Sequence, residues 1–294
     1  MAQTSPDGDT SPWAPLSRRT AGLHAEPVED VPDWLYPQLQ EWLYHVLQGT
    51  REPVMVLRPG SGLTDITREI MLRIGTATQP WLLPADDPIF LDALDATVRW
   101  SRWGKWILEG GTRTGDPFGD PNNLEQTLAA ANSAWRVNTD WRGLERRVNP
   151  TVTQAVTTTI HNADAETAGH LAASWEAAYG RRPDPDKAYA EAVKAVEAAA
   201  CPRVLPASAT ATLGTVRDHL RAATAKWELV LPGKDGTPGD ITPVVAMMTA
   251  LWDGQRSRHA GTPTARRQDQ AEAAIHLAAT LVQWLSNGAV RGKV

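Results

Sequence analysis

A short basic segment concentrates side chains that could bind phosphate. Arg256, Arg258 and His259 lie within four consecutive residues, directly before a segment whose pattern predicts a helix. Guanidinium groups suit phosphate because their donors form parallel hydrogen bonds. The amide donors at a helix N-terminus would also attract an anion. The segment therefore predicts a cluster that handles phosphate or RNA, and the alternative is a solvated basic loop between two helices.

Three further residues could support such a cluster. Gln255 lies four positions before His259, and Lys194 lies three positions before Glu197 in an otherwise apolar stretch. Side chains three apart on a helix share one face, so Lys194 and Glu197 are within reach of each other. We interpret them either as a structural ion pair or as a carboxylate that orients His259 or Arg258.

Two other patterns have both a structural and a functional interpretation. His276 and Glu272 are four apart, and the apolar neighbours of His276 favour a hydrogen-bonded core histidine. Trp100, Trp103 and Trp106 alternate with Arg99, Arg102 and Lys105. Tryptophans among cations could stack on bases, but spacing by three is also how one helix packs on another, and packing is the favoured interpretation.

Composition limits the classes of function. The 294 residues carry a formal charge of −5; residues 1–150 hold 14 Lys and Arg against 20 Asp and Glu (−6), and residues 151–294 hold 15 against 14 (+1). Binding of nucleic acid by the whole surface is excluded, so any such contact must be a local patch. Cys201 is the only cysteine, which excludes an internal disulfide and a cysteine zinc site and favours a reducing cytoplasm.

Several common kinds of site have no matching motif. Gly233-Lys234 is followed by Asp235, so no phosphate loop is present, and neither a His-Glu-x-x-His helix nor a Gly-x-Ser-x-Gly elbow occurs. No apolar run is long enough for a membrane helix, and the N-terminus has no signal pattern. We therefore expect no metal, no cofactor and no membrane contact.

The hydrophobic pattern predicts a mainly α protein of two helical modules. Residues 1–30 are expected to be a disordered leader, 31–110 an N-terminal helical module of unknown role, 111–123 a linker rich in Gly and Pro, and 124–288 a second helical domain. Within the second domain we expect a helix from Leu124 through Val137. Asp186 should cap a helix that Pro202 brings to an end.

Three sequence blocks of the second domain together resemble the C-terminal domain of abortive-infection proteins, a phage-defence family. The first block comprises His170–Trp175, Tyr179-Gly180 and Pro183–Tyr189, and it runs into Ala192–Ala198. The second is Val204-Leu205-Pro206 followed by Ala211–Val216, and the third is Leu251–Gly261, which includes Arg258-His259, followed by Ala271–Ala278. The resemblance covers roughly residues 124–287, and it rests on several moderately specific blocks rather than on one diagnostic motif.

The resemblance implies a helical bundle similar to HEPN domains, which occur in many defence proteins. Active members of that group pair as homodimers and cleave RNA without metal. They place Arg-x(4 to 6)-His near the start of the last core helix, where His acts as acid or base and Arg stabilises the charged intermediate. For this chain the resemblance therefore implies an endoribonuclease in which His259 is the acid or base and Arg256 or Arg258 stabilises the charge on the phosphate.

This sequence departs from that pattern, because no arginine lies five to seven positions before His259. The alternative is a non-catalytic interaction module that binds a phage or host partner, including a phage-derived trigger. In that case the last helix, Ala271 to Leu285, would form the dimer or partner interface.

Overall fold

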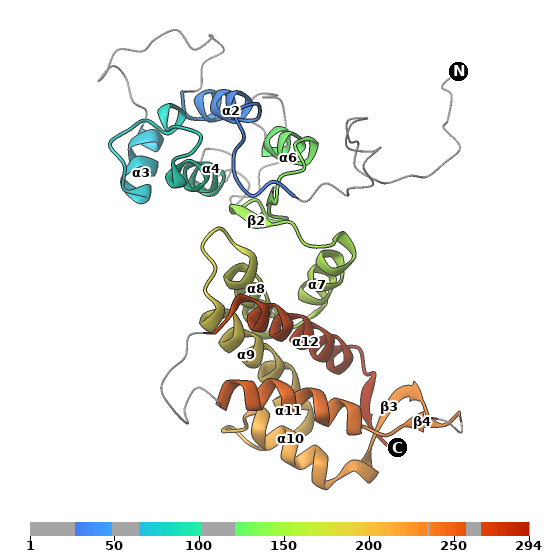
Figure 1. Cartoon of the computed structure of the whole chain (residues 1–294). Coiled ribbons are helices and arrows are strands. Elements are labelled where there is room, and N and C mark those ends of the chain that lie inside the picture. Colours follow the sequence, from blue (N-terminus) through green and yellow to red (C-terminus); the bar gives the residue numbers. More distant parts are fainter. Residues whose placement is uncertain (1–26, 49–64, 101–120, 234–235, 257–265, 294) are drawn as a thin grey trace, which may run out of the picture. The chain divides into compact units, whose positions relative to one another are not determined.

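A computed structural model describes residues 27–48, 65–100, 121–233, 236–256 and 266–293. The described chain is mainly helical, as the sequence predicts, and it divides into two compact units, Met1–Arg147 and Val148–Val294 (Figure 1). The division falls later than the expected linker at 111–123. Leu124 and Leu128 explain the difference, since both are buried in the core of the first unit.

The first unit combines helices with one small hairpin. Its elements in chain order are α2 (Tyr36–Gln48), α3 (Asp65–Ile74), a 3₁₀ turn (Pro80–Leu82), α4 (Pro88–Trp100), α6 (Pro121–Ala130), β1 (Trp135–Val137) and β2 (Leu144–Arg146). The helix expected from Leu124 through Val137 is therefore wrong in its second half. The chain leaves the helical path at Asn132, whose φ is +51°, and Trp135–Val137 pairs antiparallel with Leu144–Arg146.

The segment before α2 also belongs to the first unit. Val28 forms a parallel bridge with Ser133, and Glu29 accepts a hydrogen bond at its backbone oxygen from Trp135 Nε1 at 3.0 Å. The Glu29 carboxylate pairs with Arg146 at 2.5 Å. Described structure thus begins before residue 31, inside the expected leader, whose residues 1–26 lie outside the described part.

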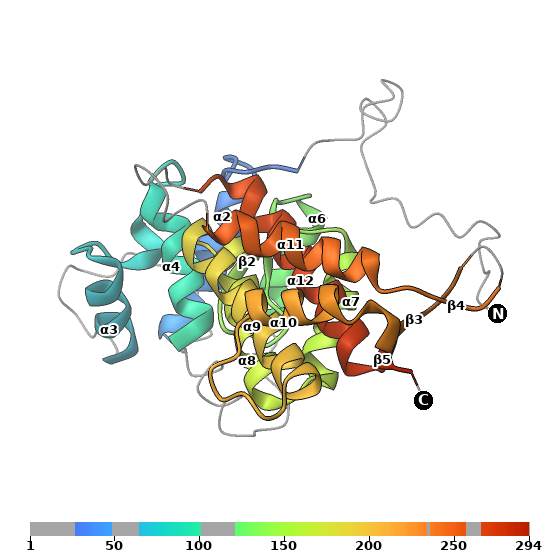
Figure 2. The same ribbon diagram turned by 90° about the horizontal axis from the view of Figure 1, so that it is seen from below.

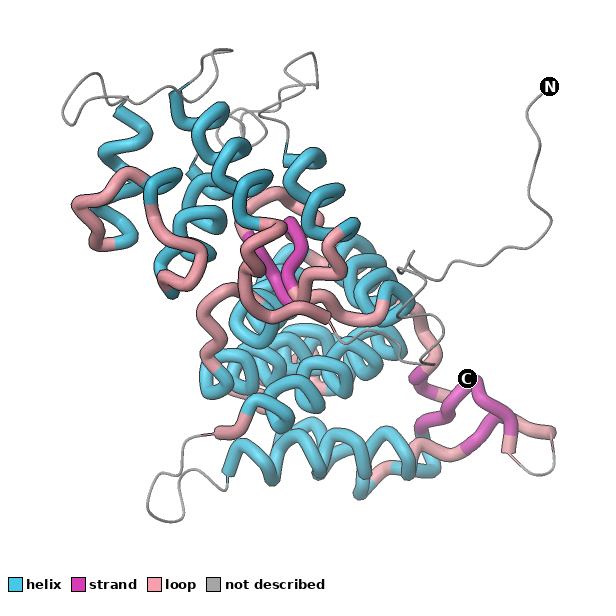
Figure 3. The backbone as a smooth tube through the Cα atoms, turned by 45° about the horizontal axis from the view of Figure 1, so that its top comes forward, coloured by secondary structure: helices cyan, strands magenta, loops and turns pink. Residues whose placement is uncertain are grey.

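The described residues of the second unit form a bundle of six helices with a small sheet at one end. Its elements are α7 (Pro150–Asn162), α8 (Ala165–Tyr179), α9 (Pro185–Val204), α10 (Leu213–Ala222), a 3₁₀ turn (Thr224–Lys226), β3 (Trp227–Pro232), β4 (Pro238–Gly239), α11 (Thr242–Arg256), α12 (Gln268–Ser286) and β5 (Val290–Gly292). The three strands form an antiparallel sheet in the order β4-β3-β5. Figure 3 shows strands in two places only among the described residues, the hairpin of the first unit and this sheet.

Helix ends in the second unit follow capping chemistry that the sequence only partly predicts. Asp184, not Asp186, caps α9, because its side chain accepts from the Lys187 amide at 3.0 Å. Pro202 does not end α9, which continues to Val204. Proline removes one amide donor and disrupts most in a helix interior. Here it lies in the last turn.

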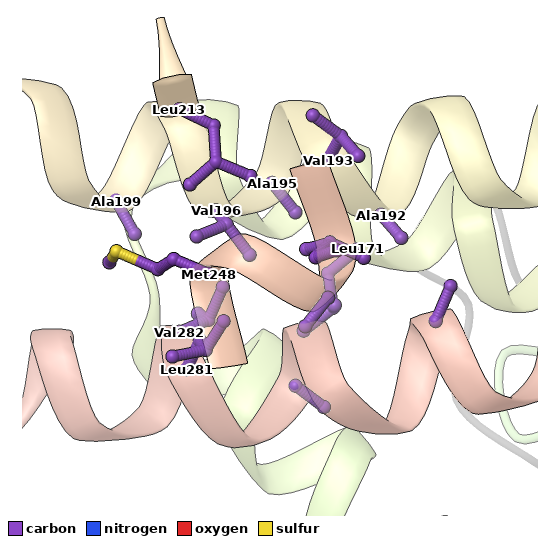
Figure 4. Close-up of a cluster of buried hydrophobic side chains, with 14 of the residues drawn as sticks. Leu171, Ala192, Val193, Ala195, Val196, Ala199, Leu213, Met248, Leu281 and Val282 are labelled. Atoms are coloured by element: carbon purple, nitrogen blue, oxygen red, sulfur yellow. The ribbon is translucent and has the colours of Figure 1, made fainter. Parts of the chain in front are cut away.

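Helix α12 lies between the other helices of the bundle. It packs against α8 and α9 on one side and α7 and α11 on others, while α10 and α11 run side by side (Figures 1 and 2). Leu281 and Val282 of α12 point toward Val196 of α9 and Met248 of α11 (Figure 4). Eight residues of its apolar face are buried: Ala271, Ala274, Ile275, Ala278, Ala279, Leu281, Val282 and Leu285.

That burial overturns one expectation about partners. The apolar face of Ala271 to Leu285 was expected to form a dimer or partner interface, but it is already covered by helices of its own unit. An interface on the second unit must therefore use another surface. Substituting Leu281, which is 0% exposed, would disturb folding before it disturbed association.

Candidate functional site

The predicted basic segment is described only in part. Arg258 and His259 lie outside the described residues. Arg256 is the last residue of α11. The segment was expected to precede a helix N-terminus directly, but α12 begins only at Gln268. Because the C-terminal end of a helix carries partial negative charge, the dipole of α11 does not favour an anion at Arg256.

The supporting residues are placed apart from one another. Lys194 pairs with Glu191 on the same helix, with Nζ 2.7 Å from Oε1. The Glu197 carboxylate instead accepts from the backbone amide of Leu213 at 2.8 Å, which satisfies a free donor at the start of α10. The interpretation of Lys194 and Glu197 as partners is therefore wrong, and Glu197 joins α9 to α10.

Gln255 is partly buried near the end of α11. Its Oε1 is buried and finds no hydrogen-bond partner among the described residues. This is the one predicted supporting residue that remains beside Arg256, and its neighbour Gly254 is in close contact with α9.

His276 is a hydrogen-bonded core histidine, as its apolar neighbours predicted. Its Nε2 lies 2.9 Å from the Tyr179 hydroxyl, and the two rings stack at 6.1 Å between centroids. Burial lowers the pKa of His276, and the nearby Glu272 carboxylate opposes that shift. Burial, with a smaller effect of Glu272, raises the pKa of Tyr179, so both groups are held neutral at pH 7.

A second histidine–carboxylate contact joins α8 to α9. His170 Nδ1 lies 2.7 Å from Glu191 Oε2, and the other oxygen of Glu191 binds Lys194. Burial would raise the pKa of Glu191, but the hydrogen bonds from Lys194 and His170 outweigh it and hold the pKa below its usual range. Spacing along one helix does not predict this contact, because the partner of His170 lies on the next helix.

Sequence reasoning missed the most connected side chain of this region, Arg266. It lies just before α12, and only 9% of its side chain is exposed. Its guanidinium stacks on the Tyr189 ring with Cζ 3.6 Å from the centroid, and Nη2 donates to the Gly254 carbonyl at 3.0 Å. Its Nε is 3.4 Å from Oδ1 of Asp186. One side chain thus joins the start of α12 to α9 and to the end of α11.

The three sequence blocks converge at close contacts between glycines and aromatic rings. The Tyr189 hydroxyl donates to the Leu251 carbonyl at 2.9 Å, and a Cβ at Gly254 would collide with that hydroxyl. A Cβ at Gly214 would lie 2.8 Å from the Trp252 ring, closer than real Cβ contacts. Glycine at 214 and 254 therefore lets α10 and α9 approach α11.

Arginines from three segments gather at this end of the bundle. Gln268 Nε2 donates to the Ala178 carbonyl at 2.6 Å, which places the start of α12 beside the end of α8. Together with the contacts of Arg266, this brings three pieces of chain into one region. The arginines that these pieces carry are Arg181 and Arg182 after α8, Arg256 at the end of α11, and Arg266 and Arg267 before α12.

The neighbouring carboxylates at this end are engaged. Asp186 pairs with Arg266, Asp269 pairs with Arg267, and Asp184 caps α9. Arg217 of α10 contacts Asp253 at 3.6 Å beside the same junction. These contacts hold the ends of the helices together at this end of the bundle.

The first unit contains a partial form of the predicted tryptophan stripe. Trp100 ends α4 and packs partly buried against the core, with the Arg73 guanidinium 4.4 Å and the Arg99 guanidinium 5.4 Å from its ring. This supports the packing interpretation for Trp100. Trp103 and Trp106 lie outside the described residues.

The part of the chain that the structure describes contains neither a candidate metal site nor a candidate membrane-spanning helix. No group of three or more His, Cys, Asp or Glu side chains is arranged to hold a metal ion. None of the described helices combines the length and the apolar content needed to cross a bilayer.

Comparison with known proteins gives this chain no relative. No family model matches it, and neither a curated protein nor a solved structure matches it. The resemblance to the abortive-infection family therefore stays a prediction that rests on its sequence blocks.

Proposed function

We propose that this protein is a phage-defence protein that binds RNA, and acts on it, at the end of the second unit where α9 begins, α11 ends and α12 begins. The observation that carries the proposal is that the end of α8, the end of α11 and the start of α12 meet there, which brings together chain segments that carry Arg181, Arg182, Arg256 and Arg267, in a chain with no overall basic charge. A local basic patch is the form that phosphate binding must take in such a chain.

The convergence of the sequence blocks supports the same site. Tyr189, Gly214, Leu251 and Gly254 come from all three blocks, and they contact one another or their direct neighbours at this end. An HEPN-like bundle with Arg256, Arg258 and His259 at that position would act as a metal-independent endoribonuclease. His259 would exchange the proton of the 2′-hydroxyl, and the arginines would stabilise charge on the phosphate.

Cleavage of total RNA and of tRNA by the purified protein tests the catalytic proposal. Wild type and His259→Ala are incubated with each substrate, with EDTA and with added Mg²⁺. We expect wild type to cleave in EDTA and His259→Ala to lose at least about a hundredfold in rate, the usual contribution of acid–base catalysis. Equal cleavage by the two proteins would assign the activity elsewhere.

A non-catalytic module is the second candidate, because no arginine lies five to seven positions before His259. This protein would bind RNA or a phage-derived trigger through the same arginines without cutting, and it would pair with a second copy through a surface other than the apolar face of α12. Protection of cells against phage should then survive His259→Ala and be lost in the charge reversal Arg181→Glu with Arg182→Glu. Loss of protection in a folded His259→Ala protein would contradict this candidate.

A further inference from the structure

The segment before α2 lies against the hairpin of the first unit as a short added strand. The Val28 amide donates to the Asn132 carbonyl at 2.9 Å, and the Val28 carbonyl accepts from the Ala134 amide at 2.8 Å. Val28 and Ser133 thus form a parallel bridge just before β1. Addition of an extended segment to an existing strand is a common way in which domains bind peptides. Here the bound segment belongs to the same chain, and we call residues 27–31 the strap.

Two side chains of the hairpin bind the next residue of the strap. Trp135 Nε1 donates to the Glu29 carbonyl at 3.0 Å, and the Arg146 guanidinium pairs with the Glu29 carboxylate at 2.5 Å. Arg146 Cζ also lies 5.8 Å from the centre of the Trp135 ring, so that the ring and the cation form one surface. The site combines main-chain pairing with donors for one carbonyl and one carboxylate. An extended peptide with an acidic residue meets all of these requirements.

The contacts that hold the strap are few and lie close to solvent. The side chains of Arg146 and Glu29 are 43% and 51% exposed, and an ion pair of that kind stabilises by under about 1 kcal/mol. Residues 27–30 are exposed or half-buried, and burial begins only at Val31, where the chain approaches α2. The strap can therefore leave the hairpin while the core around α2 stays intact.

The surface under the strap needs an extended segment to complete its hydrogen bonds. Ser133, Ala134 and Trp135 are all buried. Departure of the strap would break the hydrogen bonds of the Ala134 amide and the Trp135 indole to Val28 and Glu29. A buried donor that loses its acceptor costs about 1–3 kcal/mol, and main-chain groups at the open side of a strand pair readily with another chain. A second extended segment is therefore favoured over an open site.

We propose that the strap is an autoinhibitory contact, which occupies a docking site for an extended acidic segment of a partner protein. The partner segment would pair its backbone with Ala134 and place its acidic side chain at Arg146. Because the strap belongs to the same chain, its effective concentration at the site is on the order of 1 mM. A partner must therefore make contacts beyond those of the strap, and the first unit opens only to such a partner. This role is independent of RNA binding by the second unit.

The indole N–H of Trp135 reports the occupancy of the site in the full-length protein. Its resonance in the ¹⁵N spectrum is identified by its loss in Trp135→Phe. The double variant Val28→Pro with Glu29→Ala weakens the strap, because proline has no amide to donate and alanine has no carboxylate for Arg146. We expect the resonance to move away from its wild-type position in this variant. An acetylated and amidated peptide with the sequence of residues 27–32, at about 5 mM, should move it back.

Charge exchange at Arg146 tests the specificity for an acidic residue. In the double variant, adding Arg146→Glu should weaken binding of the acidic peptide at least about tenfold, and it should favour a peptide in which lysine replaces the glutamate. Arg142→Glu is the matched control, since that arginine is exposed on the same hairpin but pairs with Asp140 rather than with the strap. It should leave the affinity for the acidic peptide within about twofold.

Two results of the spectra would overturn the proposal. If the Trp135 resonance keeps its wild-type position in the double variant, the strap is not held by these contacts. If the resonance moves but the acidic peptide does not return it, the site does not accept a segment from another molecule.

Hydrogen exchange in the wild type keeps the proposal testable if the double variant does not fold. The Ala134 amide donates to the strap, whereas the Val137 amide, three residues further along, donates to the Glu125 carboxylate. Local departure of the strap should let Ala134 exchange at least about tenfold faster than Val137. Equal protection of the two amides would contradict the proposal, because the strap would then leave only when the whole hairpin unfolds. No RNA is present in these measurements, so their outcome is separate from that of the proposed function.

Discussion

The two units of this protein build their cores from different residues. Leucine is the commonest buried residue in the first unit, where it surrounds large rings such as Trp81 and Phe90. Alanine is the commonest buried residue in the second unit, above all along α9 and α12. Small side chains let the backbones of two helices approach closely, whereas large rings fill the wider space between helices that lie further apart. The first core should therefore be most sensitive to lost volume and the second to added volume.

The largest expected effect is a truncation in the first unit. Trp81 is 2% exposed and packs edge-on against Tyr44, with 5.6 Å between ring centroids. Trp81→Ala should lower the free energy of unfolding by about 3–5 kcal/mol, measured by chemical denaturation. Trp34→Ala is the control, because that ring is 57% exposed and should cost under about 1 kcal/mol. Similar losses in the two variants would contradict the packing of Trp81.

An enlarged side chain in the second unit should have the next largest effect. Ala278 is 0% exposed in the face of α12 that the other helices cover. Ala278→Leu should cost about 1–3 kcal/mol of unfolding free energy, because neighbouring side chains must leave their preferred rotamers. Ala273→Leu lies on the exposed side of the same helix and should be nearly neutral. If the two substitutions cost the same, the seam between α9 and α12 is not closely packed.

The smallest expected effect concerns the polar pair inside the second unit. Burial lowers the pKa of His276, so the native state favours the neutral ring while the unfolded chain titrates near about 6.5. Below about pH 6.5 the unfolded state therefore binds more protons at this histidine than the native state does. The free energy of unfolding then falls as the pH falls further. Between pH 7 and pH 5, wild type should therefore lose more stability than His276→Gln, measured by denaturation at each pH. Parallel pH profiles would show that the pKa of His276 does not change on folding.

Local patterns predicted the elements that local chemistry determines. The helix Asp65–Ile74 can be read from its clear apolar period and from Gly75, with φ +71°, directly after it. The strand Trp135–Val137 was missed, because three residues carry little period and their pairing with Leu144–Arg146 depends on the turn between them. Asp184 and Asp186 are equally good caps by residue type, but α9 begins at Pro185, so Asp186 lies inside its first turn and pairs with Arg266 instead.

In the candidate site, too, contacts within one helix could be predicted from the sequence, and contacts between distant segments could not. The hydrogen-bonded core position of His276 could be predicted, because its apolar neighbours belong to its own helix. The roles of Glu197 and Arg266 could not, since their partners lie far along the chain, at Leu213 for the first and at Tyr189 and Gly254 for the second. A charged side chain that binds across helices leaves no periodic pattern around itself.

The glycine contacts constrain how this chain can change over evolution. At Gly214 the space of a side chain is filled by the Trp252 ring, and at Gly254 it is filled by the Tyr189 hydroxyl. A descendant that gained a side chain at 214 would have to reduce residue 252, and one that gained a side chain at 254 would have to reduce residue 189. Residues 214 and 252 should therefore mutate together, and so should residues 254 and 189, with a small side chain opposite a large one in each pair. Coupled variation within the first pair would mark the α10–α11 contact, and within the second the α9–α11 contact, in any lineage that keeps this fold.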